Sequence, residues 1–277
     1  MFIRRCVVGC AIAIVSHLCG WCIVVQGQIP YERSSAPAAI LPQTATSDPQ
    51  AISIMQSTLA HLGGVEEWRG IRSAETHVTV TRPDGTSPKK LYMLDDWSTD
   101  NTRFRRRSPA FTGAPVDHNG SGMRVIHSPK GMTAVPEFDQ ARVLLQHLPG
   151  ASLEIILRKP EYLVKSAKNR FCASSSQCVD VYRKNPHGPT LKEQEWTIST
   201  ETGLPMSVRY AGLSLMSSSM QVWEKIDFGT FQKSGNVLVP GDAMLGTPNG
   251  HSAKFTFDPP AFNQPYDTKK FDAKEIQ

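Results

Sequence analysis

The chain has 277 residues, of which 40% are hydrophobic and 20% are charged, and its formal net charge is +5 at pH 7. This length suffices for one sizeable domain with its own core, and two smaller domains would also fit. The small positive charge falls far short of the one-sided basic surface that is typical of nucleic-acid-binding proteins, so we expect no nucleic-acid partner.

The N-terminal segment 1–27 has the features of a secretory signal peptide. Arg4 and Arg5 form a basic start, an almost wholly apolar run follows over Cys6–Val25, and Val25-Gln26-Gly27 offers small residues for cleavage. An apolar run of about 20 residues can also span a bilayer, so an uncleaved membrane anchor is the alternative. We therefore expect a periplasmic or secreted protein, or a membrane-anchored one that contacts the membrane through this segment.

Residues 28–46 are rich in Pro, Ala, Ser and Thr and contain little that could be buried. This composition predicts a flexible linker. The remaining residues, 47–277, are expected to form a single domain. Cleavage of the signal would leave 28 basic and 25 acidic residues, a net charge of +3.

Four of the six cysteines lie in the signal segment, which leaves Cys172 and Cys178 for the folded domain. The five residues between them form a short polar loop between two strand-like runs. In an oxidising compartment this spacing favours a disulfide that closes a hairpin. The spacing is too long for the usual paired thiolate ligands and no second pair exists, so we expect no metal site.

The domain begins with a predicted amphipathic helix. Ser47 is the expected cap, and Asp48 and Pro49 suit the first turn. Gly63-Gly64 supplies the positive φ angles that end a helix, and a short turn with Trp68 and Ile71 leads to the first strand. The apolar positions recur at helical spacing: Ile52, Met55, Leu59 and Leu62.

Most of the sequence that follows reads as strands separated by turn residues. A second helix is expected where Phe138, Ala141, Leu145 and Leu148 repeat at helical spacing, ending at Pro149-Gly150. The run Leu153–Leu157 is short and uniformly apolar and favours neither state. The expected strands cover residues 77–81, 89–96, 102–107, 123–127, 132–135, 162–167, 179–183, 191–199, 204–210, 219–231, 237–245 and 253–257.

Alternating apolar residues on the later strands would all face one side of an antiparallel sheet. Two helices are few to cover such a face, so a concave side partly open to an apolar ligand is one interpretation, and a closed core is the other. Glu224 interrupts one apolar row and would need a partner if it faces inward. The residues expected to line a ligand cavity are Met206, Val208, Tyr210, Met220, Val222 and Phe228.

The basic run Arg103–Arg107 would alternate along one strand. It suits either a solvated outer face or contact with anionic head groups or an acidic partner.

No stretch of the sequence matches a catalytic motif. The eight histidines are scattered without metal-ligand spacing, and phosphate-binding and dinucleotide-binding fingerprints are absent. Asn119-Gly120-Ser121-Gly122 lacks the first glycine of a nucleophile elbow. Asp95 and Asp96 are neighbours on a strand and would point to opposite faces. We therefore expect no catalytic residue and no cofactor, with a secreted hydrolase of unrecognised active site as the alternative.

Several short motifs resemble those of the periplasmic lipoprotein-localisation carriers (LolA/LolB-like). They are the Leu62-Gly63-Gly64 helix end followed by Trp68 and Ile71, Thr202-Gly203-Leu204-Pro205 opening a strand, Val237-Leu238-Val239-Pro240, and Phe271-Asp272 in the tail. The resemblance implies a mainly β (α+β) fold: an incomplete antiparallel β-barrel or strongly curved sheet with covering helices, enclosing an apolar cavity.

The resemblance also implies a function. We expect an exported, non-enzymatic protein that binds a lipid or lipoprotein acyl chain, as a carrier or an envelope sensor, with a lipid or an acylated protein as partner. The disulfide hairpin is not part of the common pattern of that family.

Overall fold

The structure is a computed structural model that describes residues 40–83, 87–98, 103–108, 116–118, 123–128, 131–136, 144–167, 172–184, 189–214, 217–246 and 252–268. The chain divides into two compact units, Met1–Pro30 and Tyr31–Gln277. All described residues belong to the second unit. The predicted signal segment 1–27 and most of the predicted linker lie outside them.

Three helices are bounded in the described part of the chain: α1 (Pro49–His61), α2 (Val65–Gly70) and α4 (Pro149–Arg158). None of them is long and apolar enough to cross a membrane. The strands are β1 (Ile40–Leu41), β2 (Ser73–Thr81), β3 (Lys89–Asp96), β4 (Arg103–Ser108), β5 (Val116–His118), β6 (Met123–Ser128), β7 (Gly131–Pro136), β8 (Tyr162–Ala167), β9 (Ser176–Arg183), β10 (Thr190–Ser199), β11 (Pro205–Ser214), β12 (Ser217–Phe228), β13 (Phe231–Ser234), β14 (Val237–Pro240), β15 (Asp242–Gly246), β16 (Ser252–Phe257) and β17 (Ala261–Phe262).

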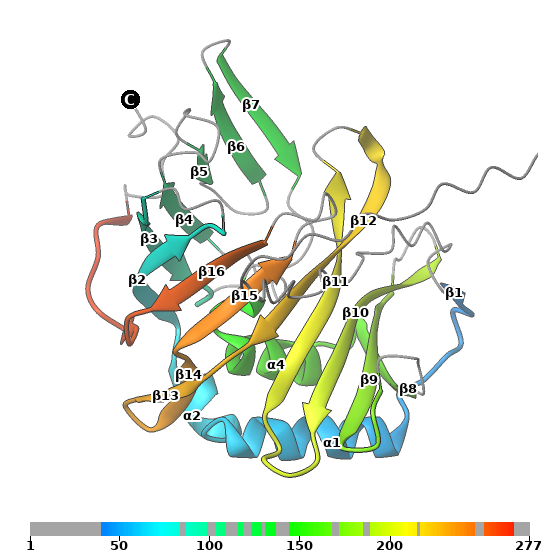
Figure 1. Ribbon diagram of the computed structural model, residues 1–277. Helices are drawn as coiled ribbons and strands as arrows, with labels where there is room; N and C mark the ends of the chain where they lie inside the picture. Colours follow the sequence, from blue (N-terminus) through cyan, green and yellow to red (C-terminus); the bar gives the residue numbers. More distant parts are fainter. Residues whose placement is uncertain are drawn as a thin grey trace, which may run out of the picture. The chain divides into compact units, whose positions relative to one another are not determined.

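Thirteen strands form one antiparallel sheet in the order β5-β4-β3-β2-β16-β15-β12-β11-β10-β9-β8, with β1 on β10 and β17 on β2. The end strands β5 and β8 do not pair with each other in the described part of the chain, so the sheet is not closed. Figure 1 shows the sheet curving, with α1 and α4 on its concave side. The predicted fold, mainly β with an unclosed, curved antiparallel sheet and covering helices, is confirmed.

The start of α1 is fastened to the edge strand β8. Asp48 is the cap: its Oδ1 accepts from the Gln50 amide at 3.0 Å, and its Oδ2 accepts from the Ser166 amide at 3.2 Å. Ser47, the expected cap, instead accepts from the Val164 amide through its Oγ at 3.2 Å. The prediction was wrong by one residue because Ser47 satisfies an amide of β8, which would otherwise lack a partner at the edge of the sheet.

The end of α1 follows the sequence prediction. Gly63 and Gly64 have φ angles of 123° and 93°, which residues with a Cβ rarely adopt. The Leu62 carbonyl then accepts from the Leu238 amide of β14 at 3.0 Å. The helix is therefore held at both ends, by β8 at its start and by β14 at its end.

The second helix begins where it was expected to end. Pro149 is the first residue of α4, and the unassigned run Leu153–Leu157 lies inside that helix. Proline is favoured at this position because the first amide of a helix has no intrahelical acceptor. Of the segment expected to be helical, Leu144 and Leu145 are helical and a turn follows them. Phe138 and Ala141 lie outside the described residues.

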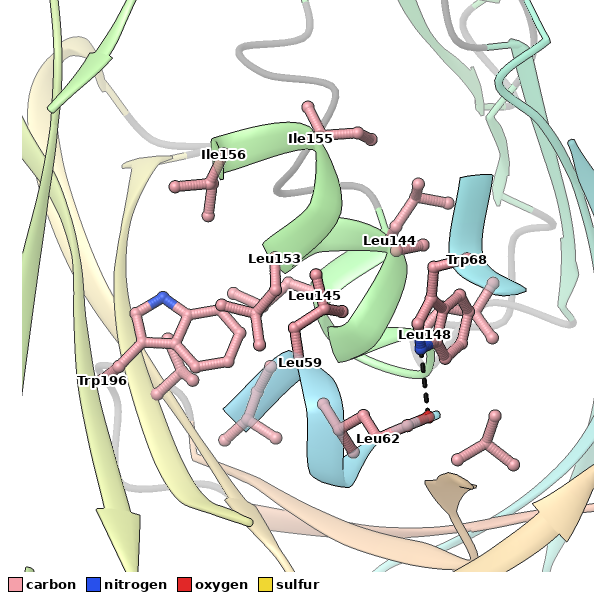
Figure 2. Packing of buried hydrophobic residues seen from close by; sticks show 14 of the residues in the cluster. Leu59, Leu62, Trp68, Leu144, Leu145, Leu148, Leu153, Ile155, Ile156 and Trp196 are labelled. Carbon is pink, nitrogen blue, oxygen red and sulfur yellow. Dashed lines mark hydrogen bonds between the residues drawn. The ribbon is translucent and has the colours of Figure 1, made fainter. Parts of the chain in front are cut away.

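The core lies between the two main helices and the inner face of the sheet. Figure 2 shows Leu59 of α1 and the cap residue Leu62 after it, Leu153 of α4 and the cap residue Leu148 before it, and Trp196 of β10 converging there. The inner-face residues at the centre are buried as the alternation predicts: Trp196, Ile198, Val208, Tyr210, Ile226, Phe228 and Phe257.

The structure also describes the predicted disulfide and part of the predicted linker. Cys172 and Cys178 form the expected disulfide, with their Cα atoms 5.8 Å apart, at the start of β9. Ile40 and Leu41, within the predicted linker 28–46, form β1 and pair with Leu191 and Thr190 of β10.

Candidate functional site

The residues expected to line a ligand cavity occupy three different settings. Val208 and Tyr210 are 0% and 1% exposed, so in this conformation both are buried in the core, and Phe228 is 9% exposed. Met206 is 46% exposed. Met220 and Val222 lie on β12, but their side chains are outside the described set.

A β-bulge explains why Met206 leaves the inner row. Trp196 pairs with Val208 and Thr197 with Ser207, but Ile198 pairs with Pro205. Met206 is therefore the extra residue, and strand alternation fails at that point. The structure brings Val208, Tyr210 and Phe228 together on the inner face and excludes Met206 from it.

Glu224 faces inward and has the partner that its position requires. The Tyr210 hydroxyl donates to Glu224 Oε2 at 2.5 Å, and Gln146 Nε2 donates to the Tyr210 oxygen at 3.1 Å. Tyr210 and Glu224 are direct cross-strand partners, so their side chains share one face. Glu224 remains half-buried, because this chain of three polar groups lies at the margin of the closed core.

A groove of about 300 Å³ opens between α1, the end of α4 and the edge strand β8. Its apolar lining includes Ile52 of α1, Ile156 of α4, and Tyr162 and Val164 of β8. Ile156, Tyr162 and Val164 also belong to the buried core, so the floor of the groove is continuous with it. The groove is open to solvent, so it gives access to the margin of the core between the helices and the sheet.

The turn from α4 into β8 creates the groove. Lys159 leaves the helix with an extended conformation, φ −88° and ψ 128°, as the residue before Pro160 is expected to do. The Tyr162 amide donates to the Lys159 carbonyl at 3.2 Å, and the Lys184 amide donates to the Glu161 carbonyl at 2.8 Å. The helix therefore stops short of the sheet edge, and the last apolar side chains are left partly uncovered.

All charged residues of the lining are positive. The lining contains Arg158, Lys159 and Lys184, and no aspartate or glutamate. Arg158 Nε is fixed by hydrogen bonds of 2.9 and 3.2 Å to the carboxylate of Glu154, one turn earlier in α4. Glu154 is itself buried and also accepts from Arg69 Nε at 3.4 Å.

Charged groups also gather on the outer face of the sheet, but they balance one another. Lys192 Nζ lies 2.7 Å from Glu195 and 3.4 Å from Asp180, and Arg209 lies 2.7 Å from Glu195. Both cations lie over the ring of Trp223. Burial raises the pKa of Asp180, against the opposing effect of Lys192. Two cations face two acids, so this cluster offers no net charge to a ligand.

The buried pair of His147 and Asp95 was not predicted from the sequence. His147 Nε2 lies 2.8 Å from Asp95 Oδ2, and both side chains are 0% exposed. Asp96, on the opposite face as predicted, accepts from the Ser98 amide at 2.9 Å. The two members of the pair are 52 residues apart, and a carboxylate expected inside a strand was the one available hint.

Two other sites considered in the sequence analysis lie wholly or partly outside the described residues. Arg103–Arg107 belongs to β4, and its side chains are outside the described set, as is Ser121 altogether. Among the residues that the structure describes, no three histidine, cysteine, aspartate or glutamate side chains are arranged to hold a metal ion.

No family model and no curated protein sequence matches the chain. Similar solved structures include a DUF1329 family protein from Desulfovibrio piger, with 9% identity, a TM-score of 0.49, and coverage of 82% of this chain and 99% of that one. A putative outer membrane lipoprotein-sorting protein domain from Vibrio parahaemolyticus has 8% identity, a TM-score of 0.48, and coverage of 82% and 97%. A LolA superfamily protein from Nitrosomonas europaea has 9% identity, a TM-score of 0.47, and coverage of 82% and 99%. What this chain binds is therefore argued from its own residues.

Proposed function

We propose that this protein is an exported, non-enzymatic carrier or sensor that binds the acyl chain of a lipid or of an acylated protein. The observation that carries the proposal is the groove between α1, α4 and β8, whose apolar floor continues into the core. Its volume of about 300 Å³ is at the lower end of the range for small-molecule sites. One segment of an acyl chain would fit into the groove, and the rest of the ligand would stay outside it.

Export is proposed from the N-terminal sequence. The basic start and the apolar run over Cys6–Val25 are those of a secretory signal, and a disulfide between Cys172 and Cys178 suits an oxidising compartment.

A binding role is favoured over a secreted hydrolase by the state of the polar groups. The described pair that most resembles a catalytic dyad, His147 and Asp95, has no exposed side-chain surface, so a substrate could not reach it without a change in conformation. A general base must come within hydrogen-bonding distance of the proton that it removes.

The inner-face residues that were expected to line the cavity would contact a ligand only after a change in conformation. Val208, Tyr210 and Phe228 would touch a ligand if α4 moved away from the sheet and let a chain pass from the groove into the core. Met220 and Val222 continue the same strand beyond Glu224. Their part in binding stays a prediction.

The test uses the neutral fluorescent probe N-phenyl-1-naphthylamine with the full-length protein and with two matched variants of α1. Ile52→Trp fills the groove, whereas Ser53→Trp adds the same bulk on the exposed side of the helix. We expect the wild type and Ser53→Trp to bind the probe equally, and Ile52→Trp to bind it at least ten-fold more weakly, which corresponds to about 1.4 kcal/mol.

Thermal unfolding of both variants checks that each is folded. The proposal fails if the wild type binds no probe, or if the two tryptophan variants bind it equally well. If the wild type binds the probe, native mass spectrometry of the purified protein, searching for a co-purified lipid, would identify the natural ligand.

A further inference from the structure

We propose that the groove selects amphiphiles whose head carries a negative charge, a carboxylate or a phosphate, over neutral ones with the same chain. This inference rests on the proposed function, because the chain must first enter the groove. The inference concerns the rim of the groove, formed by Arg158, Lys159 and Lys184, to which the proposed function assigns no role.

The rim is built from two elements that meet at the turn between α4 and β8. Arg158 and Lys159 end the helix, and Lys184 follows the last residue of β9. The hydrogen bond from the Lys184 amide to the Glu161 carbonyl, 2.8 Å long, holds the end of β9 against that turn. All three cationic residues therefore line the mouth of one groove.

The neighbouring acids do not cancel this charge. Glu154 is divided between Arg158 and Arg69, so an arginine lies on each side of its carboxylate. Glu161 precedes β8 but is not part of the lining. Asp48 follows the lining residue Ser47, but its carboxylate accepts from the amides of Gln50 and Ser166 and is not part of the lining. Among the residues that line the groove, three are cationic and none is acidic.

A purely structural role for these cations predicts something different. Lysine and arginine at the end of a helix are stabilised by the helix dipole, so their loss would lower stability whatever ligand is present. A role in head-group recognition predicts a loss of affinity for anionic ligands alone. The two roles are therefore separable by comparing charged and neutral ligands on one variant.

The apolar floor would bind the chain of an amphiphile, and the cationic rim would bind its head group. A ligand with a ten-carbon chain in the groove would place its head group at the rim. There the head group and the rim cations would both be partly exposed to solvent. Contacts of this kind are screened by salt. We expect a preference of about ten-fold for the anionic head at low ionic strength, the effect of two or three partly exposed ion pairs.

The experiment measures displacement of N-phenyl-1-naphthylamine by decanoate, decyl phosphate and 1-decanol. The wild type should bind decanoate or decyl phosphate about ten-fold more tightly than 1-decanol, and 0.5 M NaCl should narrow the difference. Lys184→Gln should weaken binding of the anions and leave 1-decanol unchanged. Lys165→Gln, on β8 but not among the residues that line the groove, is the matched control and should change neither.

Each outcome supports or overturns one of the two proposals. Equal affinity for the anions and 1-decanol, or an equal effect of Lys184→Gln on all three, overturns head-group selection and leaves the proposed function standing. Failure of all three compounds to bind refutes the function and the selectivity together. The order of decanoate and decyl phosphate tells whether the rim suits a fatty acid or a phosphate head.

Discussion

Gly150→Ala should destabilise the protein, because Gly150 is where α4 packs against the ring of Trp68. A Cβ atom at position 150 would lie 2.5 Å from Trp68 Cζ2 and closer still to two other atoms of the indole. The ring cannot easily retreat: it is 1% exposed, its Nε1 donates to the Leu62 carbonyl at 3.1 Å, and Phe262 packs against it edge-on with the centroids 6.1 Å apart. Figure 2 shows the ring and this hydrogen bond beside α4.

The size of the effect follows from how these parts can move. Adding a methyl group to a filled core forces shifts that cost about 1 to 3 kcal/mol. The gain in helix propensity from glycine to alanine returns less than about 1 kcal/mol. We therefore expect the free energy of unfolding of Gly150→Ala to fall by about 1 to 3 kcal/mol.

Gly70→Ala is the matched control. Gly70 ends α2, and a Cβ atom there would have no neighbour within 4 Å. We expect no loss of stability, or a gain of up to about 1 kcal/mol from the restricted unfolded chain. Urea denaturation followed by circular dichroism measures both variants. If Gly150→Ala proves as stable as Gly70→Ala, the close contact between α4 and Trp68 is not present in the protein.

Three further predictions concern stability. His147→Leu should cost about 3 to 5 kcal/mol in urea denaturation because it exchanges the partner of buried Asp95 for an apolar group, and adding Asp95→Leu should recover part of that loss; strictly additive effects would contradict the pairing. Cys172→Ser should cost about 2 kcal/mol by opening the short loop to Cys178, whereas an unchanged midpoint, or two free thiols in the unreduced protein, would show that the bond does not form. Hydrogen bonds from the Ser166 side chain and the Gln50 amide lower the pKa of Asp48 below 3.8, so Asp48 stabilises the fold above about pH 4 and this contribution is lost as the pH falls through the lowered value. Asp48→Asn should flatten the pH dependence of stability in that acidic range, and an unchanged profile would contradict the assignment.

Local sequence signals predicted what depends on a few neighbouring residues. The apolar repeat of α1 and the glycine pair after it were sufficient because helix spacing and positive φ angles are properties of short segments. Pro149 was misread for the same reason. Proline suits both the end of one helix and the first position of the next, so the choice depended on where the following residues pack.

The groove could not be predicted because its residues come from three segments far apart in the sequence. Ile52, Arg158 and Lys184 meet only through the topology, which sets α1 and the end of α4 against the edge strand β8. The prediction for Met206 was wrong for a different reason. Alternation assumes an unbroken strand, and the bulge leaves Met206 without a cross-strand partner, while Val208 and Tyr210 after it keep the inner face.

The anchoring of the helices decides how a ligand longer than the groove could be accommodated. At the start of α1, the side chains of Ser47 and Asp48 accept hydrogen bonds from amides of β8, and at its end the Leu62 carbonyl accepts from the Leu238 amide. The described contacts of α4 with its neighbours are mainly side-chain packing and the ion pairs of Glu154, which can rearrange at lower cost than a hydrogen-bonded backbone. Under the proposed function, a longer acyl chain would enter by displacing α4. The packing of Gly150 on Trp68 would oppose this movement, which would also expose Val208 and Tyr210.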